Sequence, residues 1–180
     1  MPWIDLRIVV IQSLVFSKMY YCLSVWANTT ASNIFKLQAV QNFAVRIITN
    51  SRKFDHITPL LKELQWITVK QYLFYCDAVL TFKSMSGTVP EYLSQQFVRR
   101  GSISGRCTRN SQSLNIPLYK SATGQRTFYY RAVSPWNVLP ENIKSSASIQ
   151  TFKRKLIFNL SKISFRNWFL AFYSFTICNQ

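Results

Sequence analysis

The most reactive pair of neighbouring side chains in the sequence is Asp55 followed directly by His56. A carboxylate that orients an imidazole can make the histidine a general base, but a base needs a group to activate. No motif places a serine or cysteine beside this pair, and the serines lack the G-x-S-x-G context of a hydrolase. The alternative is a capping or polar-loop role just ahead of Thr58 and Pro59, and we favour that interpretation.

The cysteines and the single histidine are too scattered to predict a metal site. No C-x-x-C pair occurs, and His56 lies 20 residues from Cys76, its nearest cysteine. A structural zinc site needs converging ligands, usually with one closely spaced pair. We therefore expect no metal and no cofactor, and we expect buried, reduced thiols in an intracellular compartment, with nucleus or cytoplasm left open. The four cysteines are Cys22, Cys76, Cys107 and Cys178.

The carboxylates are equally dispersed. Phosphoryl transfer onto a growing strand needs two carboxylates close enough to share divalent ions. The sequence has no adjacent pair of aspartates and no acid repeated within one helical turn. We therefore expect a non-catalytic chain. The six acids are Asp5, Asp55, Glu63, Asp77, Glu91 and Glu141.

Net charge is the strongest compositional signal. The chain has 22 Lys and Arg against 6 Asp and Glu, a formal charge of +16 and a pI near 10.1. Such a field concentrates polyanions around the protein. RNA or DNA is the first candidate partner and an anionic membrane surface the second, while a basic chain with no specific ligand is the alternative.

The basic residues gather most clearly in residues 99–131, which contain seven Lys and Arg and no acid. Interleaving with Phe128, Tyr129 and Tyr130 suits phosphate contact combined with base stacking, although a solvated loop joined to buried aromatics is an equal alternative. Residues 153–155 form a second patch, for which a charged helix face is nearly as good an explanation. The candidate nucleic-acid-binding residues are Arg99, Arg100, Arg106, Arg109, Lys120, Arg126, Arg131, Lys153, Arg154 and Lys155.

The elements that position these residues should be mainly helical. Apolar residues make up 48% of the chain, with only 4 glycines and 6 prolines, which favours a helical bundle over a turn-rich sandwich. We expect a helical domain at 1–97, a basic, irregular or β-hairpin-like segment at 98–140, an amphipathic helix at 141–164 and an apolar tail at 165–180. The apolar stretch at 168–178 has 11 residues, against about 20 for a bilayer span.

Apolar periodicity predicts the individual helices. Ile8, Ile11, Val15, Met19 and Leu23 recur at helical steps, which predicts one long buried helix over residues 4–27. A second stripe predicts a helix that ends near Asn50. The stripe comprises Ile34, Leu37, Val40, Gln41, Ala44, Val45 and Ile48. The tryptophans expected to anchor the core, because each lies beside aliphatic helical positions, are Trp26, Trp66 and Trp136.

Capping signals place the remaining elements. Thr58 and Pro59 predict the start of a short helix, Thr68 opens a longer one that ends at Gly87, and Ser148 caps a final amphipathic helix. Residues 114–119 could form a short strand. Residues 126–136 suit helix or strand, and we favour helix.

Five segments, taken in order and with their spacing, resemble the region beyond the palm of non-LTR (LINE-type, jockey-like) retrotransposon reverse transcriptases. They are YYCLSVWAN at 20–28, LQAVQNFAVRIIT at 37–49, HITPLLKELQWITV at 56–69, LTFKSMSGTVPEYL at 80–93, and FYYRA with PWNVLPENI and SIQTFKRKL within 124–156. The resemblance covers roughly residues 4–160. Thr68 stands where the family usually has proline and Tyr72 where it usually has arginine, and nothing after residue 161 matches.

This resemblance implies a detached, thumb-like C-terminal region. The family's metal-binding aspartates, in an F-x-D-D-type motif, and its endonuclease would lie upstream of these residues. The region would hold an RNA template and primer duplex by its phosphates, next to the upstream palm domain of the intact element. The alternative is a membrane-associated or protein-interaction remnant that uses the basic surface and the apolar tail.

Overall fold

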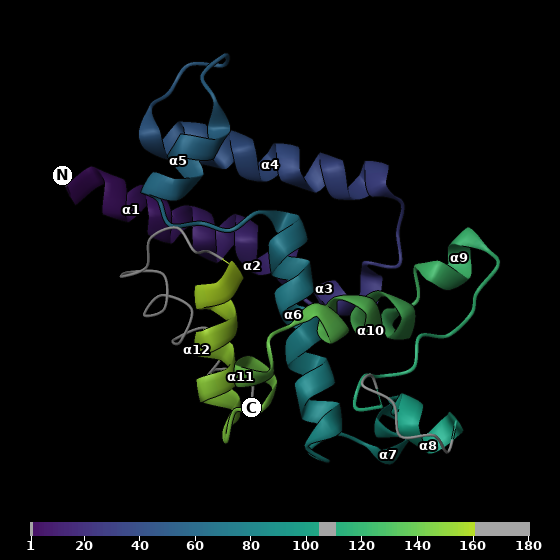
Figure 1. The fold of residues 1–180 in the computed structure, drawn as a ribbon. Coiled ribbons are helices and arrows are strands. Elements are labelled where there is room, and N and C mark those ends of the chain that lie inside the picture. The colour runs from purple at the N-terminus through teal and green to yellow at the C-terminus, as the bar shows by residue number, and fades with distance from the viewer. Residues whose placement is uncertain (1, 105–110, 161–180) are drawn as a thin grey trace. The chain divides into compact units, whose positions relative to one another are not determined.

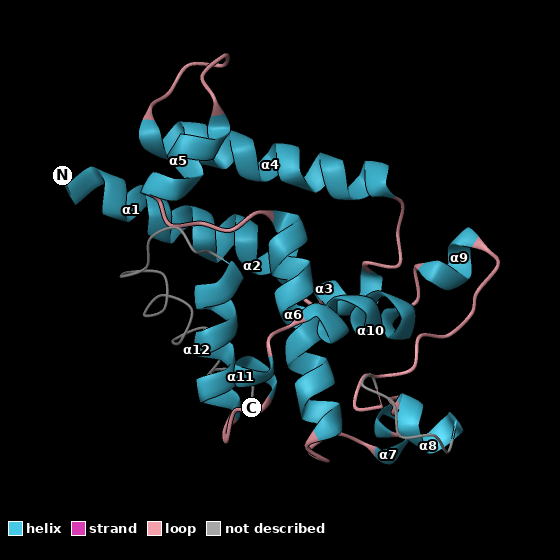
Figure 2. Cartoon of the chain, viewed as in Figure 1, coloured by secondary structure: helices cyan, strands magenta, loops and turns pink. Residues whose placement is uncertain are grey.

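The computed structural model describes residues 2–104 and 111–160, and these residues form helices joined by loops (Figure 1, Figure 2). The predicted, mainly helical fold class is therefore confirmed. Across the described ranges there is no β-strand, and the nearest feature is one isolated antiparallel bridge between Arg99 and Leu114. The strand expected at residues 114–119 is wrong, because only Leu114 pairs with a neighbouring segment.

The chain forms two compact units that interleave along the sequence. Of the described residues, the first unit takes 2–21, 30–72 and 158–160, and the second takes 22–29, 73–104 and 111–157. The first unit contains α1 (Pro2–Ile11), the π-helical turn η1 (Gln12–Phe16), α2 (Ser17–Tyr20), α4 (Ala31–Thr49) and α5 (Ile57–Glu63). The second contains α3 (Leu23–Trp26), α7 (Glu91–Ser94), α8 (Arg100–Ser104), α9 (Ala122–Gln125), α10 (Phe128–Val138) and α11 (Glu141–Lys144). The division falls inside α6 (Val69–Met85) and α12 (Ile149–Leu160).

The single buried helix expected over residues 4–27 is wrong, because the helix is interrupted twice. The Ser13 hydroxyl donates to the carbonyl of Val10 and the Ser17 hydroxyl to that of Ser13, the kind of side-chain bonding that bends helices, and the backbone widens into η1 here. Cys22 then adopts a left-handed conformation with φ of 48°. Cys22 is also exposed, contrary to the expectation of a buried thiol, while Cys107 and Cys178 lie outside the described residues.

This interruption changes which side chains are buried. Phe16, Met19 and Leu23 are buried, whereas Val15, part of the predicted buried stripe, is 36% exposed. A π-helical turn contains more than four residues, whereas an α-helical turn contains 3.6. Apolar residues spaced for an α-helix therefore no longer all lie on the buried side after η1.

The predicted ends of α4 and α6 are confirmed. Asn50 ends α4 in the left-handed region, with φ of 52°, and Gly87 follows α6 with φ of 69°. At the start of α6, Thr68 N donates to Gln71 Oε1 at 2.9 Å and Gln71 N donates to Thr68 Oγ1 at 3.3 Å. This reciprocal exchange is a capping box, which satisfies two main-chain donors that the helix itself leaves unpaired.

Two other helix predictions need adjustment, and one stands. α5 begins at Ile57 with His56 as its capping residue and no side-chain cap, so Thr58 is not the cap. Val40, assigned to the buried stripe of α4, is 45% exposed because it projects away from Gln41 and Ile48. The Ser148 hydroxyl accepts from Thr151 N at 3.2 Å and caps α12 as predicted.

Each unit has its own core. In the first, Phe16 meets Trp66 edge to face at 4.7 Å. In the second, the fully buried Phe152 stacks on Phe82 at 4.3 Å and lies 5.8 Å from Trp136. Trp66 and Trp136 are each 7% exposed and act as core anchors as expected, but Trp26 is 37% exposed and does not. Within the described residues, every helix is too short or too polar to span a bilayer.

Candidate nucleic-acid interface

The candidate basic residues that the structure describes all belong to the second unit. Arg106 and Arg109 lie outside the described residues. Counted over its sequence, this unit has twelve Lys and Arg against three Asp and Glu. The positive field of this unit therefore attracts anions, and a cation can bind an anion where its side chain is not already used within the protein.

Arg131 has a structural role in this unit. Its Nε donates to Asp77 Oδ2 at 2.7 Å and its NH2 to Oδ1 at 3.2 Å, so the pair is bidentate. The same guanidinium donates to the carbonyls of Ser24 at 2.9 Å and Arg126 at 3.1 Å. The Asp77 side chain is 3% exposed, and burial raises its pKa although Arg131 acts to lower it. With these four bonds, Arg131 joins α3, α6 and α10 rather than offering donors to a ligand.

The start of α8 is tied to residues 111–115 by main-chain bonds. Arg100 N donates to Ser113 O at 2.9 Å and Asn115 N donates to Val98 O at 2.8 Å, while the Arg99 side chain bonds Gln112 Oε1 at 2.7 Å. This arrangement keeps the exposed Arg99 at the edge of the unit.

A single asparagine holds the same segment against α10. Asn137 Oδ1 accepts from Leu114 N and Asn137 Nδ2 donates to Leu114 O, each at 2.9 Å. The amide thus makes both bonds that a neighbouring strand would make, and Leu114 is 1% exposed beneath it.

Two tyrosines and two cations lie together at α9 and the adjoining segments. The ring centroids of Tyr119 and Tyr130 are 6.1 Å apart, and Tyr119 is 39% exposed. Lys120 is exposed beside Tyr119, and Arg126 follows α9 with its Nε bonded to Ala122 O at 3.1 Å. We call Tyr119, Lys120, Arg126 and Tyr130 the tyrosine cluster.

A glycine makes the tyrosine cluster possible. A Cβ at Gly124 would lie 2.8 Å from Tyr119 Cβ and 2.9 Å from its Cγ, closer than packed carbon atoms approach. The Ser121 hydroxyl accepts from Gly124 N at 3.1 Å and fixes the short helix against the ring. Ser121 and Gly124 were not predicted from the sequence, and only the close approach of backbone to ring identifies them.

The other aromatic residues of the predicted stacking set pack inward. Phe128 and Tyr129 meet the buried Phe97 edge to face, at 6.0 and 5.3 Å. The Tyr129 hydroxyl donates to Asn115 O at 3.0 Å, and burial raises the pKa of this phenol. Of the three aromatics proposed to stack on bases, Tyr130 is therefore the one whose ring pairs with the exposed Tyr119.

The second basic patch lies on α12. Lys155 Nζ donates to Asn142 O at 2.7 Å and joins this helix to α11. Lys153 is half-buried, and its pKa is lowered, first by burial and second by the positive charge of Lys83 on α6. Arg154 is exposed. Two like charges therefore face each other across α6 and α12.

Asp55 bonds within the loop that precedes α5. Asp55 Oδ2 accepts from Arg52 N at 2.7 Å, and the Asp55 carbonyl accepts from Arg46 NH2 at 3.2 Å. These bonds match the polar-loop interpretation favoured from the sequence, whereas no side chain caps α5. In the part of the chain that the structure describes, no three His, Cys, Asp or Glu side chains gather to hold a metal ion.

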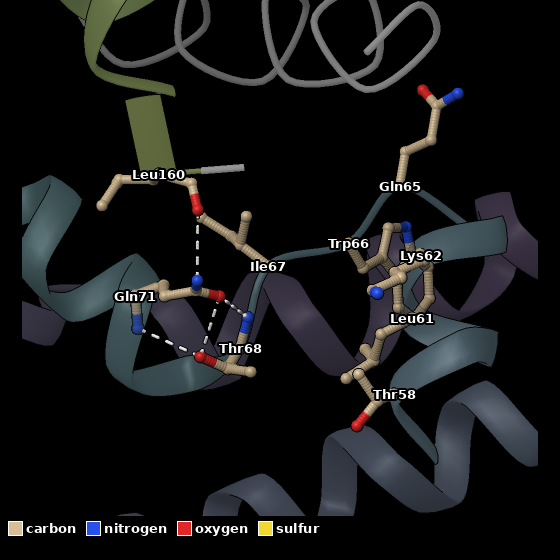
Figure 3. A pocket seen from close by; sticks show the side chains of 9 residues that line it. All are labelled: Thr58, Leu61, Lys62, Gln65, Trp66, Ile67, Thr68, Gln71 and Leu160. Atoms are coloured by element: carbon tan, nitrogen blue, oxygen red, sulfur yellow. Dashed lines mark hydrogen bonds between the residues drawn. The ribbon is translucent and has the colours of Figure 1, made fainter. Parts of the chain in front are cut away.

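A pocket of about 160 Å³ lies in the first unit, between α5 and the start of α6 (Figure 3). Figure 3 shows the Gln71 amide at its edge, where Nε2 donates to Leu160 O at 3.2 Å. The lining contains no histidine, cysteine or carboxylate, and its one titratable side chain is Lys62. The lining residues are Thr58, Leu61, Lys62, Gln65, Trp66, Ile67, Thr68, Gln71 and Leu160.

No protein-family model, curated protein or solved structure matches the chain. The fold class and the positions of the side chains are therefore established by the structure alone. Any assignment to a family rests on the five sequence segments quoted above.

Proposed function

We propose that the chain is a non-catalytic, thumb-like C-terminal fragment of a non-LTR retrotransposon RNA-directed DNA polymerase whose second unit binds nucleic acid. The observation that carries the binding proposal is the tyrosine cluster, in which two partly exposed rings lie 6.1 Å apart and Lys120 and Arg126 flank the short helix α9 between them in sequence. The family assignment rests on the resemblance of residues 4–160, and the scattered carboxylates support the absence of a polymerase centre.

In this proposal Lys120 and Arg126 contact phosphates while the two rings meet bases. Arg126 uses Nε within the protein, and its two terminal nitrogens suit the paired oxygens of a phosphate. Stacking on a tyrosine contributes about 1–3 kcal/mol per base and does not depend on sequence. The expected binding is therefore tolerant of sequence and driven by charge.

Lys83 and Lys153 offer a second contact. The pKa of Lys153 is lowered first by burial and second by repulsion from Lys83, and an anion bound beside both side chains would offset the second cause. The proposal thus assigns phosphate contacts to Lys120 and Arg126 and, separately, to Lys83 and Lys153.

Salt dependence tests the proposal directly. Fluorescence anisotropy of a labelled RNA–DNA duplex measures affinity as salt rises from about 50 to 200 mM, and about 6 phosphate contacts lower it roughly a thousandfold. Affinity that is independent of salt contradicts the proposal, as does nucleotide incorporation by the purified chain, because the sequence lacks a carboxylate pair.

A matched pair of variants locates the contact. Lys120→Gln with Arg126→Gln removes two cations from the tyrosine cluster, and Lys53→Gln with Lys70→Gln removes two exposed cations from the first unit. The first variant should reduce the slope of log affinity against log salt by about 1.8, at about 0.9 per phosphate on a duplex, and the second should leave it unchanged. An equal effect of both variants would show only a response to net charge.

A further inference from the structure

The first unit exposes an apolar surface that its own described residues leave uncovered. On α1 and η1, Leu6 is 55% exposed, Val9 60% and Leu14 64%; on α4, Phe43 is 66% exposed. Single exposed apolar residues are ordinary, but a contiguous group on two packed helices marks an interaction surface. We define the α1–α4 face as Leu6, Val9, Val10, Leu14, Val40, Phe43 and Ile47.

Helical geometry gathers these residues on one side of each helix. Val40, Phe43 and Ile47 recur at steps of three and four along α4 and project away from the buried Gln41 and Val45. The resulting stripe runs along the side of α4 that faces away from the core of the unit.

The two helices of this face are joined directly. Figure 1 shows α1 running alongside α4, and Arg7 NH1 donates to Ile47 O at 3.2 Å. Leu6 and Val10 lie within one turn of Arg7, so this hydrogen bond brings the stripe of α1 to the end of the α4 stripe. The exposed residues therefore form one surface rather than two.

The charges near the α1–α4 face are mainly basic. Over residues 2–21 and 30–49 the chain carries four basic side chains and one acid, Asp5. The basic side chains are Arg7, Lys18, Lys36 and Arg46. An apolar surface bordered by cations is complementary to a second apolar surface that is bordered by anions.

We propose that the α1–α4 face docks a protein partner whose apolar contact surface is bordered by acidic side chains. A second copy of this chain fits poorly, because two copies would bring their basic borders together. A membrane also fits less well, since an interfacial anchor is a single amphipathic helix lying in the membrane plane, whereas this face spans two packed helices. This surface belongs to the first unit and is independent of the nucleic-acid contact proposed for the second.

Two synthetic helical peptides serve as probes. Both carry the same leucine face, one bordered by glutamates and the other by lysines. Anisotropy at physiological salt should show binding of the glutamate peptide only. Phe43→Ser and Val10→Ser should each weaken that binding roughly tenfold, because they remove contact area from the centre of the face. Binding of both peptides, or of neither, overturns the proposal.

Phe35→Ser is the matched control. Phe35 is also on α4 and is 78% exposed, but it lies eight residues, or about 12 Å along the helix, from Phe43. The control should bind the glutamate peptide as the unaltered chain does, and circular dichroism melting should show all three variants folded. If Phe35→Ser weakens binding as much as Phe43→Ser, the α1–α4 face is not the site.

Two further measurements separate the other occupants. Sedimentation equilibrium that reveals a dimer abolished by Phe43→Ser assigns the face to self-association and overturns the proposal. Sedimentation with phosphatidylserine vesicles that Phe43→Ser abolishes assigns it to a membrane, with the same consequence. Nucleic-acid affinity should be unchanged in Phe43→Ser, so failure of this proposal is distinct from failure of the nucleic-acid proposal.

Discussion

Gln41 in the first unit and Asp77 in the second are both buried polar side chains, and their hydrogen-bonding needs are met in different ways. In the first unit Gln41, 1% exposed, donates through one amide nitrogen to Ile67 O at 2.8 Å and to the Tyr20 hydroxyl at 3.2 Å. In the second unit Asp77, 2% exposed, is paired with the charged Arg131. A neutral amide needs only hydrogen bonds, whereas a buried carboxylate also needs an opposite charge. The second unit is therefore the more sensitive to loss of one partner.

The largest effect should follow Asp77→Ala. It leaves the Arg131 guanidinium largely buried without its carboxylate, which costs about 3 kcal/mol of unfolding free energy. Urea unfolding measures the loss. Asp55→Ala is the control, because Asp55 is exposed and bonds only within its loop, and it should cost far less. Equal losses in the two variants would contradict the structural role of the ion pair.

The pH dependence of stability should differ between a charged and an uncharged residue at position 77. Burial raises the pKa of Asp77 above 3.8, so the folded state holds the proton more tightly than the unfolded state does. The unfolding free energy of the unaltered chain, relative to Asp77→Asn, should be greatest below 3.8 and fall as the pH rises through the raised pKa. Urea midpoints of both proteins across this range check the sign, and a difference that rises with pH would refute it.

A smaller effect is expected in the first unit. Gln41→Leu roughly keeps the side-chain volume but leaves the buried Ile67 carbonyl without its donor. The unfolding free energy should fall by about 1–3 kcal/mol. The same urea measurement applies. Gln38→Leu provides a comparison, because Gln38 accepts from Val69 N at 2.9 Å at the start of α6 but is less buried. If Gln41→Leu lowers the unfolding free energy as much as Asp77→Ala does, the two units do not differ in their sensitivity to loss of a buried partner.

The smallest change in stability should accompany Gly124→Ala. The added Cβ displaces the Tyr119 ring from the tyrosine cluster, so affinity for the RNA–DNA duplex should fall up to about tenfold, while the unfolding free energy should fall by about 1 kcal/mol, the low end of the cost of an overpacked site. Ser121→Ala tests the same short helix through its capping hydroxyl, without the steric clash. Unchanged affinity in Gly124→Ala would argue that Tyr119 takes no part in binding.

The sequence predicts what local chemistry determines. Thr68, Gly87 and Ser148 were placed correctly at helix ends because capping and left-handed backbone depend on residues within one turn. The bundle class followed from composition and periodicity for the same reason.

Contacts between residues far apart in the sequence could not be predicted in this way. The sequence does not distinguish Arg131 from the basic residues around it, because nothing in it links Arg131 to a carboxylate 54 residues away. The N-terminal interruption was missed because serine hydroxyls, rather than glycine or proline, accompany it. Gly124 carries no charge or aromatic ring, so only its distance from Tyr119 reveals its role.

The hydrogen bond from Gln71 to Leu160 joins positions 89 residues apart, and both belong to the first unit. A ribosome releases the helices of that unit early but delivers its last described residues only after the whole second unit has been made. The core of the second unit waits for the same helix, because Phe152 and Leu160 both lie on α12. Until α12 is made, the pocket beside Trp66 lacks one wall, so the earliest residues of the chain complete their packing only with the latest described ones.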